Sequence, residues 1–336
     1  MAKRTRSRNK TGSRSKIKTW PLYIVLALVF VLYFLYQGVP GLSGILGISL
    51  FAVIILIIGL EFAVGVKEEG TKKNLIEIAI AVVIVVALWF SLQAALKTST
   101  PLDVVPSCSM LPSLQRGDLV VLQGVNSVTQ LHAPVINVTS STYNAMIRNI
   151  GSEELSCVAY SQSNGQLLIS PNGYMLPGYT VGLYKSSYTG GYIVQQQPGS
   201  LIQYQCGVET VKFSNGTAGK EAALTSLTIA NTTIAGDKNN TVVVYKTVPN
   251  DLFYQIGDAY IVHRIYAIIN ASGSHYALTK GDNNPGLDLQ YSNYPASLAD
   301  IQGKVVASIP YLGYLKLILS GSFSEPSQCS GTLQSG

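Results

Sequence analysis

Long apolar runs dominate the first third of the chain, and shorter alternating patterns follow them. The runs cover about 20–37, 42–66 and 75–96. Each is close to the roughly 20 residues that an α-helix needs to cross a hydrocarbon core about 30 Å thick. From residue 98 onward, strand-length apolar segments alternate with Gly, Pro, Asn and Ser turn signals. The pattern predicts three transmembrane helices within 19–97, followed by a mainly β domain outside the membrane.

The β part is interrupted by a long polar stretch. Residues 126–240 are rich in Ser, Thr, Gly, Gln, Asn and Tyr and contain short strand patterns such as "GQLLIS" and "GYIVQQQ". A structureless loop of that length is uncommon inside a compact domain. We therefore expect 126–240 to be an inserted β-rich subdomain. The main domain is expected to comprise 98–125 and 241–321, with 322–336 as a C-terminal tail.

Charge suggests how the chain is oriented. Residues 1–18 contain eight Lys or Arg and no acid, which leaves 15 basic and 17 acidic residues elsewhere. A basic tail is also typical of nucleic-acid binding, but one directly before a spanning run favours the cytoplasmic side. Three spans then place the main domain outside the cytoplasm, in a multi-pass protein of the cell membrane with no nucleic-acid partner. The length of the first run and the two further spans argue against a cleavable signal peptide.

Cysteine and sequon positions agree with export. The four cysteines have no CxxC spacing of the kind that holds zinc, and we expect no metal or cofactor. An oxidising compartment would permit a Cys157–Cys206 bridge, and free buried cysteines are the alternative. The chain also contains five N-x-Ser/Thr triplets, which permit glycosylation without requiring it. They begin at Asn137, Asn215, Asn231, Asn239 and Asn270.

A serine and a histidine are the first candidates for chemistry. A serine hydroxyl is a weak nucleophile near neutral pH and needs a neighbouring base such as histidine. His132 lies in the polar insert and His275 at an expected turn, whereas His263 lies within the apolar strand "AYIVHRI". A histidine in such a strand is also compatible with a purely structural role. The segment "PSCSMLP", 106–112, is bracketed by prolines, which favour an extended backbone with its small side chains exposed.

The order of several short segments resembles a known family. "PSCSMLP", "RGDLVVL", "VVVYK", "IVHRI", "LTKGDNN" and "GKVVASIPYLG" occur in this order. Together they resemble the conserved boxes of type I signal peptidases in their archaeal and ER form, over about 90 residues. The resemblance implies a membrane-bound serine endopeptidase that removes signal peptides from exported preproteins and has a mainly β catalytic domain in 98–125 and 241–321. Membrane lipid and the protein-export machinery are further implied partners.

The resemblance also implies roles by position. Ser109, directly before Met110, matches the nucleophile, and His263 matches the general base of this branch. Asp288, six residues after Asp282, is expected to orient His263, with Asp282 supporting the site. Ser107 matches the serine whose hydroxyl joins the Ser109 backbone N–H as an oxyanion donor. A substrate bound as an added strand beside the nucleophile would favour small residues at positions −1 and −3.

Some features depart from the family pattern. Cys108 stands where the family usually has glycine, so a thiol beside the nucleophile is an open alternative. Three spans replace the usual single anchor, and the insert is far longer than the usual connection. The apolar segment 311–319 is expected either to rest at the membrane interface, with Lys316 toward the head groups, or to form a last core strand.

Two other functions remain as alternatives. A membrane-anchored surface glycoprotein would explain the spans and sequons, but not the ordered Ser, His and Asp boxes. A Ser-Lys self-cleaving protease of related fold would need Lys246 or Lys280 as its base.

Overall fold

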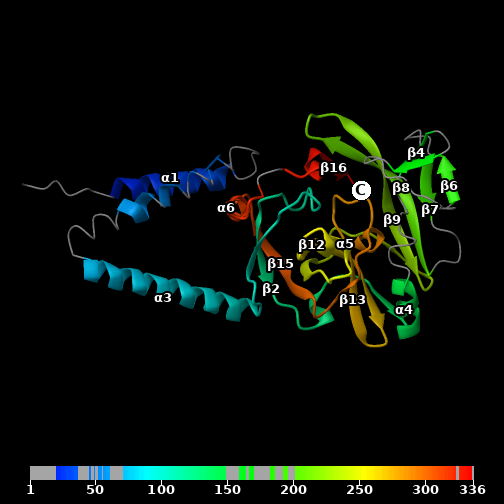
Figure 1. Ribbon diagram of the computed structural model, residues 1–336, viewed down its shortest axis with the longest axis horizontal. Helices are drawn as coiled ribbons and strands as arrows, with labels where there is room; N and C mark the ends of the chain where they lie inside the picture. The colour runs from blue at the N-terminus through cyan, green and yellow to red at the C-terminus, as the bar shows by residue number, and fades with distance from the viewer. Residues whose placement is uncertain are drawn as a thin grey trace, which may run out of the picture. The chain divides into compact units, whose positions relative to one another are not determined.

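The chain forms two compact units, 1–87 and 88–336, which are described separately. The computed structural model describes the residues in the following ranges: 20–36, 45–46, 49, 52–54, 56–60, 71–148, 159–163, 166–169, 182–185, 192–195, 201–322 and 325–334. Figure 1 gives the element labels used below.

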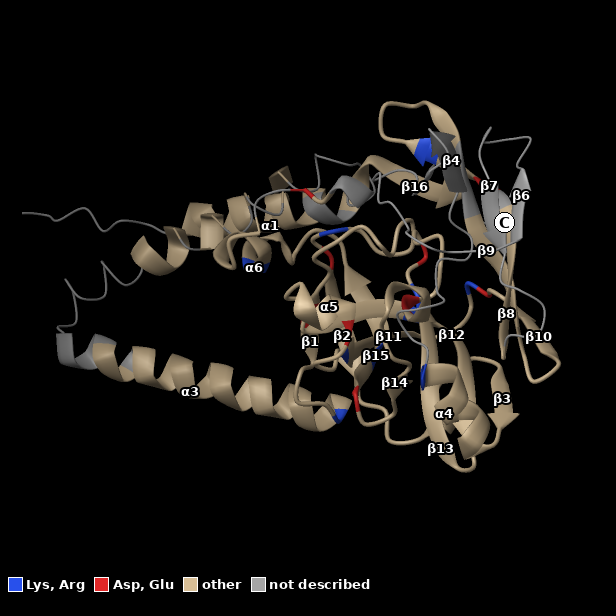
Figure 2. Ribbon diagram, turned by 45° about the vertical axis from the view of Figure 1, so that its right-hand side comes forward, with Lys and Arg blue, Asp and Glu red and all other residues tan. Residues whose placement is uncertain are grey.

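The first unit contains apolar helices. Helix α1, Trp20–Leu35, has no charged residue, and α3, Thr71–Leu96, starts in this unit and ends in the second (Figure 2). Within the described part of the chain, Ile78–Leu96 is the one helical stretch long and apolar enough to cross a membrane. Its side chains are apolar on all sides and largely exposed, as expected for a helix surrounded by lipid.

These helices bear on the three predicted spans. The third run is a helix of spanning length, whereas α1, at 16 residues, is shorter than the predicted first span. Short helical pieces at 45–46, 52–54 and 56–60 fall within the second run, and its other residues lie mostly outside the described ones. The basic tail 1–18 also lies outside them. The multi-pass topology and its orientation therefore stay predictions.

The second unit is built on a mixed sheet of eight strands. Seven of them pair antiparallel in the order β1-β2-β15-β11-β12-β13-β14, and β3 pairs in parallel with β12. Their bounds are β1 Leu102–Val104, β2 Leu119–Gln123, β3 Val135–Val138, β11 Val242–Lys246, β12 Tyr260–Ala271, β13 Ser274–Lys280, β14 Ala296–Ser297 and β15 Ile301–Ile309. The apolar segments that predicted strands form β2, β11, β12, β13 and β15, so the mainly β fold is confirmed.

Two further sheets arise mostly from the stretch 126–240. One has the order β5-β4-β7-β6 and the other the order β10-β9-β8-β16. Their strands are β4 Ala159–Ser163, β5 Gln166–Ile169, β6 Gly182–Lys185, β7 Tyr192–Gln195, β8 Ile202–Phe213, β9 Ala218–Ile229, β10 Thr232–Ala235 and β16 Gly331–Gln334. The described helices of this unit, besides the end of α3, are α4 Ser140–Arg148, α5 Leu252–Gln255 and α6 Tyr314–Leu319. Short 3-10 turns are η1 Val128–Gln130, η2 Asp288–Tyr291 and η3 Ser327–Ser330.

The stretch expected as an insert shares a core with the main sheet. Tyr143 of α4 and Leu227 of β9 lie in one buried cluster with Tyr266 and Ile269 of β12. The C-terminal strand β16 also leaves the expected tail to pair with β8. Contacts with β12 and β16 thus connect the expected insert to the rest of the unit, and the division into domain, insert and tail stays a prediction.

Segment 311–319 is not a strand. Positions 311–313 form a turn, and α6 follows it, so the expectation of a last core strand is wrong. Leu317 is buried, whereas Leu319 is 79% exposed. Lys316 forms an ion pair with Asp103 of β1, its Nζ 2.8 Å from the carboxylate oxygen. Contact of α6 with a membrane stays a prediction.

Candidate active site

The segment that carries Ser109 folds as a series of turns. The backbone N–H of Leu114 donates to the carbonyl of Met110 at 2.9 Å, and Met110 is fully buried. The bracketing prolines therefore do not impose the extended, exposed segment that we expected, because the side chain of Met110 anchors the loop in an apolar cluster. Ser109 is buried, with 8% of its surface exposed.

A buried carboxylate fixes the two ends of this loop. Asp118 accepts hydrogen bonds from the backbone N–H groups of Gln115 and Tyr311, and its own carbonyl accepts from Val105. Burial raises the pKa of Asp118, and the two backbone donors partly offset that rise. Asp118, directly before β2, thus holds the loop at Val105 before Ser109 and at Gln115 after it.

His263 lies near the start of β12, which pairs with β11, β13 and β3 in the described structure. It is opposite Val243 of β11 and is 3% exposed. Residues alternate between the faces of a strand, so His263 shares a face with Ile261 and Ile265, which belong to one apolar cluster. The apolar pattern that predicted a strand therefore also buries the imidazole.

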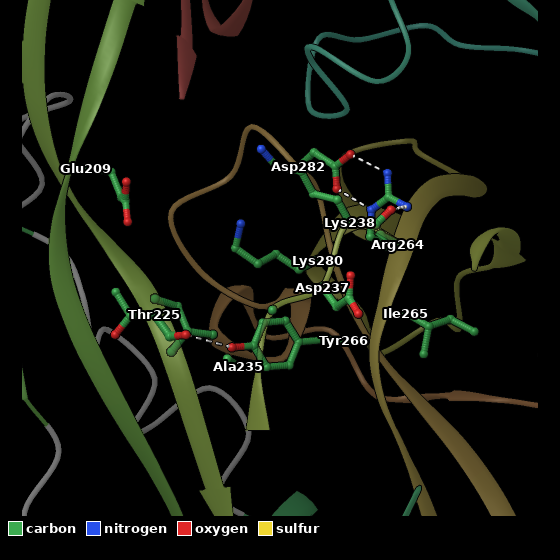
Figure 3. A pocket seen from close by; sticks show the side chains of 12 residues that line it. Glu209, Thr225, Ala235, Asp237, Lys238, Arg264, Ile265, Tyr266, Lys280 and Asp282 are labelled. Carbon is green, nitrogen blue, oxygen red and sulfur yellow. Dashed lines mark hydrogen bonds and ion pairs between the residues drawn. The ribbon is translucent and has the colours of Figure 1, made fainter. Parts of the chain in front are cut away.

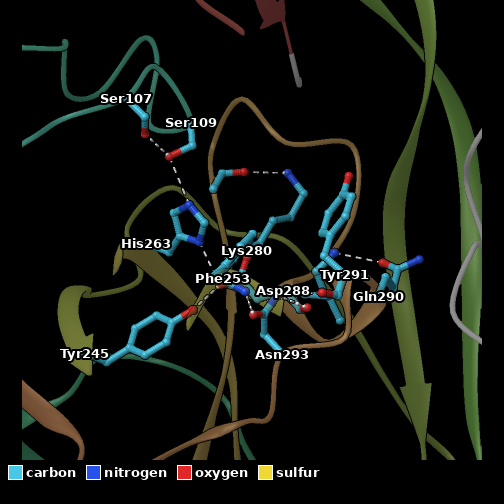
Figure 4. A network of polar contacts seen from close by, with 12 residues as sticks. Ser107, Ser109, Tyr245, Phe253, His263, Lys280, Asp288, Gln290, Tyr291 and Asn293 are labelled. Atoms are coloured by element: carbon cyan, nitrogen blue, oxygen red, sulfur yellow. Dashed lines mark hydrogen bonds and ion pairs between the residues drawn. The ribbon is translucent and has the colours of Figure 1, made fainter. Parts of the chain in front are cut away.

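The three polar side chains meet on this face of the sheet. The Nε2 atom of His263 lies 3.0 Å from Oγ of Ser109, and Nδ1 lies 2.7 Å from Oδ2 of Asp288 (Figure 4). Asp288 opens the turn η2 and is almost completely buried. A neutral imidazole that donates from Nδ1 to the carboxylate presents a free acceptor at Nε2, which is the arrangement that can take a proton from a serine hydroxyl.

Tyr245 is a second partner of the Oδ2 atom that contacts His263, and sequence analysis missed it, whereas the buried Oδ1 of Asp288 has no hydrogen-bond partner among the described residues. The tyrosine hydroxyl donates to Oδ2 of Asp288 at 2.8 Å. Complete burial and the nearby Asp288 charge raise the pKa of Tyr245 well above its usual value, so the tyrosine remains a donor. Tyr245 is two residues beyond Val243 on β11, which places it on the same sheet face as His263. That alternation was the signal available in "VVVYK".

A cavity opens beside the nucleophile. The hydroxyls of Ser107 and Ser109 are 3.2 Å apart at a cavity of about 660 Å³. Its walls come from the segment before Ser109, Arg116 in the loop before β2, the residues around the start of β12 and the residues after α6. They include Val105, Pro106, Tyr260, Val262, Ser322 and Pro326. His263 also lines the cavity although it is only 3% exposed, whereas Asp288 lies behind it and is 1% exposed.

Asp282 lies elsewhere, with Arg264. Both of its carboxylate oxygens accept from the Arg264 guanidinium, at 2.8 and 2.7 Å, and Ser113 donates to one of them (Figure 3). Arg264 also donates to the carbonyl of Asn240. Asp282 therefore contacts the loop that carries Ser109 through Ser113, whereas Asp288 contacts His263.

The two lysines of the alternative mechanism have other surroundings. Nζ of Lys280 donates to the carbonyl of Gly281 at 3.1 Å, and Lys246 is exposed at the end of β11. The Ser109 hydroxyl lies within hydrogen-bonding distance of His263, which belongs to β12.

Cys108 is not a free thiol. It forms a disulfide with Cys329, 221 residues later, so the alternative of a reactive thiol beside Ser109 is wrong. Neither this pairing nor its position beside the nucleophile followed from cysteine spacing. Cys206 is also disulfide-bonded, so it is not the free buried cysteine allowed by the sequence. Cys157 lies outside the described residues.

The two contacts of His263, with Ser109 and with Asp288, resemble the hydrogen-bonded triad that serine hydrolases use. Comparison with known proteins points in the same direction. The chain is 44% identical over 63 residues to a protein described as signal peptidase complex catalytic subunit SEC11 from Colletotrichum graminicola. It is 42% identical over 82 residues to the protein of the same description from Verticillium alfalfae. These stretches are 18% and 24% of this chain and 37% and 44% of the two relatives.

The chain spans about two fifths of the length of the curated relatives it matches. No family model matches, and no solved structure matches significantly. The partial matches support a relationship to signal peptidases, which are proteases and hydrolases. Assignment to the archaeal and ER branch stays a prediction.

Proposed function

We propose that this chain is a membrane-anchored serine endopeptidase that removes signal peptides from exported preproteins. The observation that carries the proposal is the position of His263, whose two ring nitrogens reach Ser109 and Asp288. The apolar helix α3 directly before the domain supports membrane anchoring. The two partial relatives support signal peptides as the substrate class.

The reaction starts with proton transfer. Nε2 of neutral His263 takes the proton of the Ser109 hydroxyl as the oxygen attacks the scissile carbonyl. Asp288, oriented by Tyr245, stabilises the imidazolium that results. His263 then gives its proton to the leaving amine, and water hydrolyses the acyl-enzyme by the same route. The Ser109 backbone N–H and the Ser107 hydroxyl are the proposed donors to the oxyanion.

The substrate is proposed to bind as an extra strand. β1 is an end strand of the main sheet, pairs with β2 in the described structure and leads directly to the cavity beside Ser107. An extended peptide added beside a sheet edge places alternate side chains against the protein. Small residues at positions −1 and −3 then suit the space left beside the nucleophile.

The test is cleavage of a preprotein by the detergent-solubilised chain. The wild type should cut a substrate with Ala at −1 and −3, and Ser109→Ala should not. Ser113→Ala, in the same loop, is the matched serine control and should retain cleavage. Full cleavage by Ser109→Ala would overturn the proposal.

A second arm addresses specificity and the nucleophile. A substrate with bulky side chains at −1 and −3 should be cut far more slowly than its Ala-x-Ala parent. Equal rates would favour a general surface protease. Because Cys108 is in a disulfide, a thiol-alkylating reagent without reductant should leave the rate unchanged.

A further inference from the structure

Asn283 holds the backbone on both sides of the Cys108–Ser109 peptide bond. Its backbone N–H donates to the carbonyl of Ser109 at 2.7 Å, and its side-chain Nδ2 donates to the carbonyl of Cys108 at 3.1 Å. Gly281, two residues earlier, lies so close that a Cβ there would come within 2.7 Å of the Ser109 carbonyl oxygen. The loop after β13 is therefore packed directly against the backbone of the nucleophile.

The other contacts of the same side chain are with the end of the chain. Nδ2 of Asn283 also donates to the carbonyl of Gly331 at 2.9 Å, and Oδ1 accepts from the backbone N–H of Leu333 at 2.6 Å. Both partners belong to β16, and Leu333 is buried against Val211 and Ala223 of the β8–β9 hairpin. The amide thus bridges the nucleophile loop and the C-terminal strand.

The disulfide makes the same connection covalently. Cys329 lies two residues before β16 and is bonded to Cys108, which directly precedes Ser109. The side chain of Cys108 and its carbonyl are therefore both held by groups that are fixed to β16. Ser109 lies between these attachments and the His263 imidazole.

We propose that Asn283 is a positioning residue for Ser109, and that the C-terminal segment 326–334, fixed by the Cys108–Cys329 disulfide, holds Asn283 in that position. The inference rests on the proposed function. It assigns a role to segment 326–334, which lies outside the segments that resemble the signal peptidase family. The peptide planes that Asn283 holds set both the Ser109 hydroxyl and the direction of its backbone N–H. Displacement of about 1 Å at a reacting group can lower a rate by about 100-fold.

The first test compares two adjacent asparagines. Asn283→Ala removes the bridge, whereas Asn284→Ala changes a buried neighbour whose side chain packs on Gly281. For preprotein cleavage per folded molecule, we expect Asn283→Ala to lower kcat by about 10- to 100-fold, with KM within about threefold. The acid limb of the pH profile should keep its midpoint, because the His263–Asp288 contact is untouched. Equal kcat for the two variants would overturn the inference.

A second variant covers the case in which Asn283→Ala does not fold. Asn283→Asp keeps the acceptor for Leu333 but loses the side-chain N–H groups that donate to Cys108 and Gly331. It should lower kcat in the same direction. A folded Asn283→Asp enzyme with the wild-type kcat would contradict the role assigned to the amide.

The third arm tests the C-terminal attachment. Cys329→Ser should lower kcat at a folded fraction verified by circular dichroism, and its rate should not respond to dithiothreitol. The wild type and Cys206→Ser should both fall to the Cys329→Ser rate in reductant, because both retain the Cys108–Cys329 bridge. An unchanged rate for Cys329→Ser and for the reduced wild type would overturn the attachment.

The proposed function and this inference can fail separately. If Ser109→Ala still cleaves, the proposed function is wrong and the Asn283 comparison loses its basis. If Ser109→Ala is inactive while Asn283→Ala and Asn283→Asp cleave normally, only the positioning role is wrong.

Discussion

Two neighbouring residues on β12 face opposite sides of the same strand and meet two aspartates of the same loop. His263 reaches Asp288 and Ser109 on one face, and Arg264 reaches Asp282 and Ser113 on the other. In each case a basic side chain connects the 282–288 loop to the loop that carries the nucleophile. The difference is chemical, because an imidazole can give up and regain a proton near neutral pH and a guanidinium cannot.

The contacts of His263 and those of Arg264 are therefore similar in form but differ in what they can do. The Arg264–Asp282 pair is bidentate and nearly buried, with side chains 14% and 8% exposed. Arg264 connects the 282–288 loop to the loop that carries Ser109, but its guanidinium stays protonated and cannot accept the Ser109 proton. We expect loss of the His263 contacts to affect chemistry, and loss of the Arg264 contacts to affect folding.

The largest expected effect is on the His263 face. His263→Ala and Ser109→Ala should each lower kcat by on the order of 10³-fold or more, and the double variant should add little, because the residues act as a unit. Wild-type activity should fall as the pH is lowered, because a protonated imidazole cannot accept the serine proton. Cleavage rates of the four enzymes across pH measure both effects. Near-normal turnover of His263→Ala would place the base elsewhere.

The two aspartates give the next largest contrast. Asp288→Asn should lower kcat by about 10²- to 10⁴-fold, because the amide can hold the imidazole in the wrong tautomer. Asp282→Asn should instead lower the free energy of unfolding by about 3–5 kcal/mol, because it leaves the Arg264 charge without its partner. Thermal unfolding and kcat per folded molecule separate the two. Equal kcat losses for both variants would remove the distinction between the faces.

Two buried tyrosines give a smaller effect. Tyr245→Phe should lower kcat by about tenfold, because it removes a hydrogen bond to the charged Asp288, and the free energy of such a bond corresponds to about that factor. Tyr266→Phe is the matched control, because Tyr266 donates to backbone carbonyls away from the site. Similar kcat changes in both variants would show that contact with Asp288 is not what matters.

The same two variants should differ from wild type in alkali. Burial raises the pKa of Tyr266 to about 12 and that of Tyr245 well above its usual value. The folded state therefore retains these protons, and the resulting stability is complete below about pH 10 and is lost as the pH rises further. Each Phe variant should lose less stability between about pH 10 and 12 than wild type. An unchanged slope in denaturant titrations at these pH values would contradict the burial argument.

The smallest expected effect concerns the lysines. Lys280→Met and Lys246→Met should change kcat by less than about threefold, because the proposed base for Ser109 is His263 and Lys280 donates to the Gly281 carbonyl instead. Preprotein cleavage under identical conditions is the measurement. A loss near that of His263→Ala in either variant would favour a Ser-Lys mechanism.

Strand positions could be predicted from the sequence because they depend on local alternation. "VVVYK" forms β11 and "AYIVHRI" leads into β12, and the residues picked out by the ordered boxes meet at His263, which contacts both Ser109 and Asp288. The roles of these three residues in catalysis stay predictions until the variants are measured. The resemblance to a family supplied the pairing that alternation alone could not.

Contacts between distant segments could not be predicted in this way. The register that places Tyr245 beside Asp288, the partner of Asp282 and the bond from Cys108 to Cys329 all depend on how separate segments pack. Turn geometry around Ser109 depends on burial of Met110, which a proline-based argument does not include. Cysteine spacing favoured no pairing across 221 residues.

The pairing of β12 has a consequence for hydrogen exchange. Its second half has β13 on one side and β3 on the other, and Ala267 and Ile269 are fully buried. Amide protons in such a strand exchange with solvent mainly through global unfolding. β16, with β8 as its partner in the described sheet, should exchange through smaller openings. On warming, the amide protons of β16 should therefore exchange with solvent at temperatures at which those in the second half of β12 are still protected from exchange.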